Sequence, residues 1–187
     1  KRPLSILCLE DKIAQQALVQ VLNAIYEEEF LGFSYGFRPG RSQHQALDAL
    51  YTGIVRRKVT WVLDLDIQGF FDAVSHDWMI RMLAHRIADK RLLRLIGKWL
   101  KGGIVDDGGR PQRSACGLPQ GAVVSPLLCN VFLHYVLDLW SQRWRTKRAE
   151  GDVIIVRYAD DIVAGFHHYW EAARFRRELV DRLGKFG

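Results

Sequence analysis

The sequence is poor in the residues that cross-link or ligate small secreted domains. It has three cysteines, Cys8, Cys116 and Cys129, and no two of them have metal-ligand spacing. An odd number of widely separated cysteines indicates reduced thiols in an intracellular protein rather than a disulfide framework. His167 and His168 have no third ligand nearby in the sequence, which argues against zinc. We therefore expect neither a disulfide scaffold nor a structural zinc ion.

No stretch of the chain has the pattern of a membrane span or a signal peptide. The run 122–137 carries no formal charge, but a Ser-Pro pair interrupts its start. Asn130, His134 and, just beyond the run, Asp138 recur every four residues and form a polar stripe on an otherwise apolar helix. This pattern predicts a buried helix with one face on a polar cleft. We expect no membrane partner and a cytoplasmic protein, bacterial or organellar.

Acidic residues are fewer than basic ones, 21 against 27, which gives a formal net charge of +6. A positive excess suits an anionic partner such as nucleic acid. The chain of 187 residues is 49% hydrophobic, which suits one globular domain or one domain with two lobes. It also lacks an initiator methionine, so we expect it to be a fragment of a longer protein.

Hydrophobic periodicity predicts helices interspersed with short strands. The expected helices are 9–30, 43 onward after a capping box at Ser42, 76 onward after a cap at Ser75, 92–100, the buried run 122–137, and 169–183. The expected strands are 59–66, 153–158 and 162–166, and 101–117 is expected to form a further hairpin. This order predicts an α+β fold with a small antiparallel sheet backed by helices.

Two segments have periodicities that predict which side chains face inward. In the helix 9–30 the predicted inner face is Ala14, Ala17, Leu18, Val21 and Ile25. The strand 59–66 alternates, with Trp61, Leu63 and Leu65 on one face and Thr60, Val62, Asp64 and Asp66 on the other. The aspartates are therefore expected on the open face of the sheet.

Two adjacent aspartates lie on a predicted hairpin turn, in Tyr158-Ala159-Asp160-Asp161. Neighbouring carboxylates repel, and Mg²⁺ is a natural counter-charge because it takes oxygen ligands and is usually held by one or two carboxylates. Aspartate is also common in turns for structural reasons alone. A second pair, Asp106-Asp107, precedes two glycines and is interpreted as a turn only.

A third carboxylate, Asp66, favours a metal site over a purely structural turn. If the strand 59–66 pairs beside the hairpin, Asp66, Asp160 and Asp161 converge. Three such carboxylates can hold two metal ions about 3.5–4 Å apart, which activate an attacking hydroxyl and stabilise a leaving pyrophosphate. Asp64 shares the face of Asp66 but lies roughly 6–7 Å back along the strand, and we interpret it as peripheral.

Five segments occur in a characteristic order along the chain. They are RPLSI at 2–6, YGFRPGRS at 35–42, DIQGFFD at 66–72, GLPQG at 117–121 followed by Ser125-Pro126, and YADD at 158–161. Together they resemble the fingers and palm motifs of the reverse transcriptase family, and within it the group II intron-encoded type. The resemblance covers nearly the whole chain. It implies a polymerase palm with part of a helical fingers lobe, and a thumb that is absent.

The resemblance implies a role for each matching residue. Asp66 and Asp160 would bind both metal ions, Asp161 would complete the catalytic site, and Ile67 would offer its backbone carbonyl to a metal. Phe71 matches the steric gate that excludes a ribose 2′-hydroxyl. Phe70 and Phe71 could instead both be core residues, and we expect that one of them is.

Three more matches concern the incoming nucleotide. Gln120 matches the residue that lies along the dNTP. Arg2 and Arg38 match cationic contacts to its triphosphate, where a guanidinium can pair with two phosphate oxygens. Each arginine could instead be a generic surface charge.

The implied activity is RNA-directed DNA synthesis, with dNTPs added to a primer 3′-hydroxyl using two Mg²⁺ ions, for which Mn²⁺ could substitute. The implied partners are an RNA template, a DNA primer and a structured intron RNA. The implied segments are fingers at 1–58, palm at 59–75, a fingers/palm insertion at 76–116 and palm at 117–187.

Several alternatives stay open. The chain could belong to another bacterial reverse transcriptase type, from a retron, a diversity-generating element or a CRISPR locus. An RNA-dependent RNA polymerase is disfavoured because Phe71 would oppose a 2′-hydroxyl. An inactive, maturase-like RNA-binding relic would have no need to keep the acidic residues or Gln120.

Overall fold

The structure is a computed structural model that describes residues 6–102, 104–105, 111–112 and 116–187. The chain divides into two compact units. The first unit comprises residues 1–28, 69–132 and 187, and the second comprises residues 29–68 and 133–186. Each unit is described by itself.

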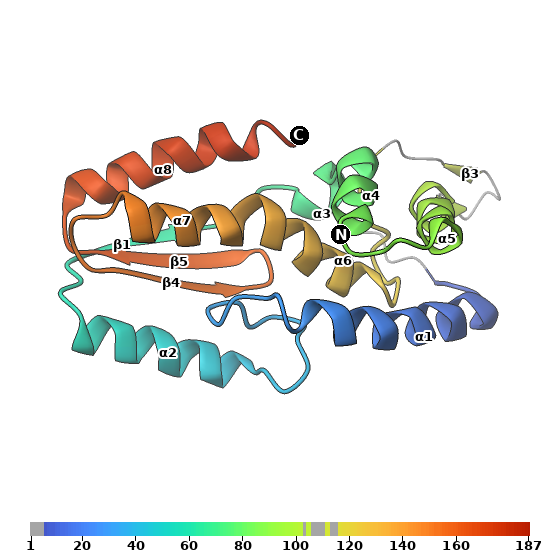
Figure 1. The fold of residues 1–187 in the computed structure, drawn as a ribbon, viewed down its shortest axis with the longest axis horizontal. Coiled ribbons are helices and arrows are strands. Elements are labelled where there is room, and N and C mark those ends of the chain that lie inside the picture. The colour runs from blue at the N-terminus through green and yellow to red at the C-terminus, as the bar shows by residue number, and fades with distance from the viewer. Residues whose placement is uncertain (1–5, 103, 106–110, 113–115) are drawn as a thin grey trace. The chain divides into compact units, whose positions relative to one another are not determined.

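The second unit is built on a three-stranded antiparallel sheet with the strand order β1-β5-β4. The strands are β1 (Trp61–Leu65), β4 (Val153–Tyr158) and β5 (Asp161–Phe166). The helices of this unit are α2 (Gln43–Arg56), the π-helix η1 (His134–Asp138), α7 (Leu139–Lys147) and α8 (Tyr169–Leu183). Figure 1 shows α2 along one side of the sheet and α8 along the other. The predicted antiparallel sheet backed by helices is confirmed.

One face of the sheet carries the core of this unit. In the β1–β5 register Leu63 pairs with Ala164 and Leu65 with Ile162, so all four side chains share a face. Ile162, Ala164 and Phe166 are fully buried on that face. The predicted alternation of β1 is therefore confirmed, with its apolar row toward the core.

Aromatic packing joins α7 and α8 to the buried face. The ring of Phe175 in α8 lies 5.3 Å from that of Phe166 and 5.1 Å from that of Trp144 in α7. The Phe175–Trp144 pair is edge-to-face, and an aromatic contact of this kind adds about 0.5–1.5 kcal/mol to the free energy gained by burial. The opposite face, which carries Val62 and Asp64, is packed by α2 on its β4 side, where Val156 forms a small apolar cluster with Tyr35 and Ala46.

The predicted buried helix is confirmed, but its polar stripe has a different role from the one expected. The helix α6 (Ser125–Leu133) leads into η1, and Asn130, His134 and Asp138 are at most 3% exposed. In η1 the amide of Leu139 donates to the carbonyl of His134, five residues back. Full burial contradicts the prediction that the stripe lines a cleft, because these polar groups lie inside the protein.

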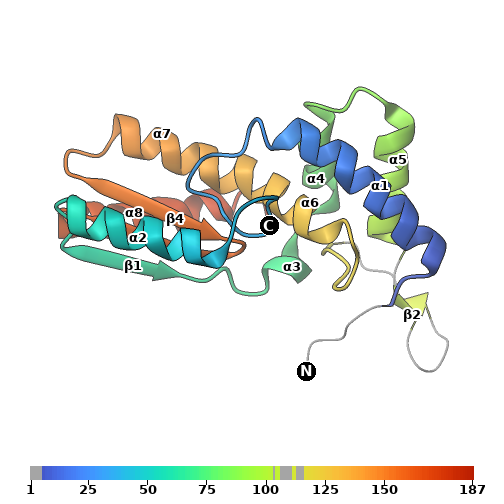
Figure 2. The same ribbon diagram turned by 90° about the horizontal axis from the view of Figure 1, so that it is seen from below.

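The first unit is mostly helical. Its elements are α1 (Leu9–Tyr26), α3 (Phe70–Ala73), α4 (His76–Ala84), α5 (Lys90–Lys101), β2 (Ile104–Val105), β3 (Pro111–Gln112) and most of α6. Figure 2 shows α1 close to α5, and the indole nitrogen of Trp99 donates to Asp11 at 3.0 Å. The pairing of β2 with β3 confirms the predicted hairpin. Its predicted turn at Asp106–Gly109 lies outside the described residues.

The inner face of α1 differs from the prediction. Its buried residues are Gln15, Leu18, Leu22 and Tyr26, whereas Val21 is 56% exposed. The polar Gln15 is tolerated inside because its Oε1 accepts a hydrogen bond from the amide of Val124 at 3.2 Å. Because the predicted inner face was chosen from apolar residues alone, it left out Gln15. The predicted face is therefore offset by about one residue from the observed one.

Two predicted helix starts are confirmed by their hydrogen bonds. Ser42 and Gln45 form a capping box, in which each side chain bonds the backbone nitrogen of the other. The Ser75 hydroxyl accepts from the amide of Trp78 at the start of α4. No helix in the described parts of the chain is both long enough and apolar enough to cross a bilayer.

Candidate active site

The acidic turn joins β4 to β5 and is tightly constrained. Tyr158 pairs with Asp161 in the sheet, which leaves Ala159 and Asp160 as a two-residue turn. Ala159 has a φ of 57°, in the left-handed region that a residue with a Cβ rarely adopts. Such a conformation persists only where neighbouring groups hold it.

A loop from the start of the second unit supplies part of that restraint. The amide of Tyr35 donates to the carbonyl of Arg157, and the amide of Arg157 donates to the carbonyl of Phe33. The loop therefore lies along the free edge of β4. A Cβ on Gly36 would overlap the backbone nitrogen of Ala159, so only glycine allows this close approach.

Arg157 restrains the turn from inside the protein. Its guanidinium is fully buried and donates two hydrogen bonds to the carboxylate of Asp138, at 2.8 and 2.6 Å. The same guanidinium donates to the Ser34 hydroxyl at 2.7 Å and to the Ala159 carbonyl at 2.8 Å. Arg157 thus connects three segments: η1 through Asp138, the loop that contains Gly36 through Ser34, and the acidic turn through Ala159. Arg157 was not among the predicted site residues, although a lone arginine in an apolar strand needs a buried acidic or polar partner.

Asp66 follows β1 directly and approaches the acidic turn. The register pairs Leu65 with Ile162 and Asp64 with Val163, and continuing it by one residue places Asp66 opposite Asp161. Asp64, Asp66 and Asp161 therefore share the face of the sheet opposite the core. The structure brings together the carboxylates that the sequence predicted to converge.

The electrostatics of Asp161 show that these carboxylates influence one another. Burial raises the pKa of Asp161, and the negative charges of Asp160, Asp66 and Asp64 raise it further. Asp64 has the smallest of these effects on Asp161. The interpretation of Asp64 as peripheral to the catalytic site therefore stays a prediction.

The acidic cluster, defined as Asp64, Asp66, Asp160 and Asp161, has the chemistry of a hard-cation site. Within the described chain none of its carboxylates forms an ion pair with a basic side chain. In this structure, however, the four carboxylates are not placed closely enough for three of them to hold one metal ion, since no three histidine, cysteine or carboxylate side chains among the described residues are. Uncompensated oxygen donors on one face fit Mg²⁺. Ile67, the next residue along the chain, is half-buried.

The predicted triphosphate ligand Arg38 has a different environment from the one expected. It is 7% exposed, and its Nη1 donates to the carbonyls of Leu31 and Ser34 at 2.9 and 2.8 Å. Its guanidinium also lies over the ring of Phe30, at 5.2 Å. These contacts hold the loop that contains Gly36. Arg2, the other predicted triphosphate ligand, lies outside the described residues.

Phe71 and Gln120 belong to the first unit. Phe70 is 5% exposed and Phe71 is half-buried against it, which agrees with the expectation that one of the two is a core residue. The amide of Leu118 donates to the carbonyl of Phe71, and Gln120 Nε2 lies 3.5 Å from the carboxylate of Asp72. The predicted steric gate and the predicted nucleotide-positioning loop are therefore joined within one unit.

Comparisons with known proteins give a consistent result. The family described as "Reverse transcriptase (RNA-dependent DNA polymerase)" matches residues 1–187. The chain is 43% identical over 134 residues to the "Uncharacterized 91 kDa protein in cob intron" of Schizosaccharomyces pombe, covering 72% of this chain and 16% of that protein. It is 38% identical over 142 residues to the "Group II intron-encoded protein LtrA" of Lactococcus lactis, covering 74% of this chain and 23% of LtrA.

A third relative and a solved structure extend the comparison. Protein YkfC of Escherichia coli is 36% identical over 154 residues, covering 81% of this chain and 40% of YkfC. Apo telomerase from Candida tropicalis, truncated from its C-terminal domain, matches with a TM-score of 0.67 and 13% identity, over 94% of this chain and 38% of that one. The telomerase likeness supports the fold alone. The chain thus spans well under half the length of these relatives, and it belongs to the reverse transcriptase family.

Proposed function

We propose that the protein catalyses RNA-directed DNA synthesis, adding dNTPs to a DNA primer on an RNA template. The observation that carries the proposal is the acidic cluster, in which Asp64, Asp66 and Asp161 share one face of the sheet and Asp160 lies in the adjoining restrained turn. Charge of this kind suits a reaction in which the protein supplies positioning and electrostatic stabilisation rather than a covalent intermediate.

Three of the four carboxylates in the acidic cluster have a proposed part in the reaction. Asp66, Asp160 and Asp161, with the backbone carbonyl of Ile67, would hold two Mg²⁺ ions, for which Mn²⁺ could substitute. The ions, when bound, supply charge stabilisation at the attacking hydroxyl and at the leaving pyrophosphate. The half-buried loop position of Ile67 and the shared face of the aspartates support this assignment.

The nucleotide-binding roles rest on the family likeness together with the local contacts. We propose that Phe71 excludes a ribose 2′-hydroxyl and that Gln120 lies along the incoming dNTP. Gly117 and Gly121 both have positive φ, which gives the Gln120 loop a shape that other residues would resist. For Arg38 its burial supports a positioning role, in which it holds the loop that packs on Ala159. The predicted contact of Arg2 with the triphosphate stays a prediction.

The biological setting is a further part of the proposal. The relatives in a Schizosaccharomyces intron and in a Lactococcus group II intron support a group II intron-like mobile element, with an intron RNA as partner. We also propose that the protein acts in the cytoplasm or inside an organelle, where such an RNA is present.

Primer extension by an Asp160→Asn variant tests the catalytic proposal. The change removes one metal ligand from a turn while keeping its size, so we expect extension to be lost and the fold to be retained. Asp48→Asn is a matched control, because Asp48 is an exposed aspartate on α2 outside the acidic cluster. Extension by Asp160→Asn at the rate of the control would refute the catalytic role. Absence of extension in the wild-type protein, with RNA binding intact, would favour the inactive relic.

A further inference from the structure

A basic surface on the first unit is not used by the proposed reaction. The helix α5 carries five basic residues and no acidic ones. Arg91, Arg94, Lys98 and Lys101 follow one another at spacings of three, four and three residues, which places them along one face of the helix. Arg91 is paired with Asp89, but Arg94, Lys98 and Lys101 are exposed and form no ion pair with the described residues. The buried residues of α5, Ile96 and Leu100, lie on another face.

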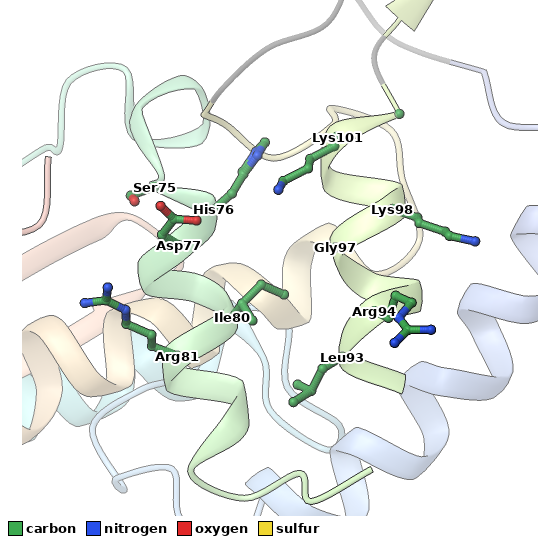
Figure 3. Close-up of a pocket in the computed structure, with 11 residues that line it drawn as sticks. Ser75, His76, Asp77, Ile80, Arg81, Leu93, Arg94, Gly97, Lys98 and Lys101 are labelled. Carbon is green, nitrogen blue, oxygen red and sulfur yellow. The ribbon is translucent and has the colours of Figure 1, made fainter. Parts of the chain in front are cut away.

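A groove of about 1300 Å³ lies between α4 and α5 and is bordered by this surface. Figure 3 shows Ile80 and Leu93 directed into the space between the two helices, so the floor of the groove is apolar. Lys101 extends across the groove toward α4, whereas Lys98 points outward from α5. Gly97 faces Ile80, where an added Cβ would make an ordinary contact at 3.8 Å. The groove thus combines an apolar floor with a cationic border.

The α4 side of the groove differs in its chemistry. Ser75, His76 and Asp77 line it at the start of α4, and Asp77 is exposed. His76 is 3% exposed and its Nε2 is 2.7 Å from the carbonyl oxygen of Gly117, so it supports the wall. Asp77 is therefore the one carboxylate that the described groove lining offers to an occupant.

We propose that the α4–α5 groove binds a single-stranded segment of RNA. Arg94, Lys98 and Lys101 contact its phosphates, and Asp77 accepts a hydrogen bond from a ribose 2′-hydroxyl. Arg94 and Lys101 are about 10 Å apart along the helix axis, a length over which one strand presents about two or three phosphates. The apolar floor suits unpaired bases, which a duplex would keep stacked inside.

The carboxylate of Asp77 favours RNA over DNA as the strand bound in the α4–α5 groove. A DNA backbone offers no hydrogen-bond donor, so Asp77 can only repel its phosphates. The 2′-hydroxyl of RNA can donate, and it is the group by which proteins distinguish the two polymers. The inference rests on the proposed function for the presence of RNA, but its binding surface does not include the acidic cluster.

The test compares two triple variants that lose the same charge. Arg94→Gln/Lys98→Gln/Lys101→Gln removes the three α5 cations that line the groove and keeps Arg81, the lining cation of α4. Glutamine is a good helix former. Arg56→Gln/Lys147→Gln/Lys185→Gln removes three exposed cations from the second unit. The affinity of the full-length protein for a fluorescent single-stranded RNA is measured without dNTPs at several salt concentrations, and circular dichroism checks folding.

The groove variant should bind more weakly than the control, by more than tenfold at about 0.15 M salt. Its plot of log affinity against log salt should be shallower by about 2, because each lost phosphate contact on a single strand changes the slope by roughly 0.7. Equal affinity and equal slope in the two triple variants would overturn the inference.

A second arm tests the choice of RNA. Wild-type protein should prefer RNA over DNA of the same sequence, and Asp77→Ala should reduce that preference by weakening RNA binding and strengthening DNA binding. An unchanged preference would overturn the role of Asp77. The test is separable from the proposed function, because Asp160→Asn should keep wild-type RNA affinity while it loses extension.

Discussion

The buried Arg157–Asp138 pair should contribute both to the free energy of unfolding and to the rate of primer extension. A single and a double variant can separate the two contributions. In Arg157→Met the carboxylate of Asp138 loses both of its hydrogen bonds from the guanidinium, in a site with no solvent exposure. Removing one partner of a buried ion pair costs about 3–5 kcal/mol, because the other charge stays buried and unpaired. We therefore expect the free energy of unfolding, measured with urea, to fall by about that amount.

The double variant Arg157→Met/Asp138→Leu should recover much of the lost stability. Replacing a buried ion pair by apolar residues is often neutral or stabilising, since neither charge then needs desolvation. The Ala159 carbonyl, however, still lacks the hydrogen bond that Arg157 donated at 2.8 Å. Because a misplacement of about 1 Å at an active site can cost about 10²-fold in rate, we expect single-turnover primer extension to stay reduced by roughly that factor.

A surface pair provides the matched control. Arg148 lies 2.6 Å from Glu178, but its side chain is 53% exposed, so Arg148→Met should cost at most about 1 kcal/mol and leave the extension rate unchanged. Recovery of both stability and wild-type extension in the double variant would refute the positioning role of Arg157. If stability recovers while primer extension stays reduced, Arg157 positions the acidic turn in addition to stabilising the fold.

Three further predictions concern single positions. Gly36→Ala should reduce primer extension with a smaller effect on folding, since its Cβ would displace the backbone at Ala159; an unchanged single-turnover rate would contradict the close packing of the loop. Burial lowers the pKa of His134, so the unfolded chain binds a proton that the native state excludes, and the free energy of unfolding should fall as the pH drops below about 6.5. His134→Leu should flatten that dependence in urea titrations at several pH values, and equal slopes in both proteins would count against it. Phe71→Val should increase ribonucleotide incorporation in competition assays, whereas an unchanged dNTP/rNTP ratio in a folded variant would place the gate elsewhere.

The parts of the fold that local rules determine could be predicted from the sequence. The capping box at Ser42 and the alternation of β1 each depend on a few consecutive residues, and both are confirmed. The convergence of Asp66 with the 160–161 turn needed only one assumption, that β1 pairs beside the hairpin. That assumption is correct because β5 forms the centre of the sheet.

The features that depend on long-range polar contacts could not be predicted. Arg157 was not predicted as a site residue because two of its partners, Asp138 and the Ser34 hydroxyl, are 19 and 123 residues away in the sequence. Gln15 was assigned to the surface because its partner, the amide of Val124, is more than a hundred residues away. In both cases the free energy of a buried polar group is determined by a partner that the local pattern does not contain.

The π-helix η1 is a place where the length of a buried helical segment can change by one residue. A π-turn holds one residue more than the α-helical turn that it replaces. Deleting one residue within His134–Asp138 would let the segment close into an ordinary α-helical turn. Because either turn completes one revolution, the helical residues that follow would keep their orientation, and a deletion that spares Asp138 would leave its carboxylate near Arg157. A deletion within the regular helix α7 would instead rotate the residues beyond it by about 100°. Primer extension should therefore survive a single-residue deletion in η1 better than one in α7, which a deletion scan would measure.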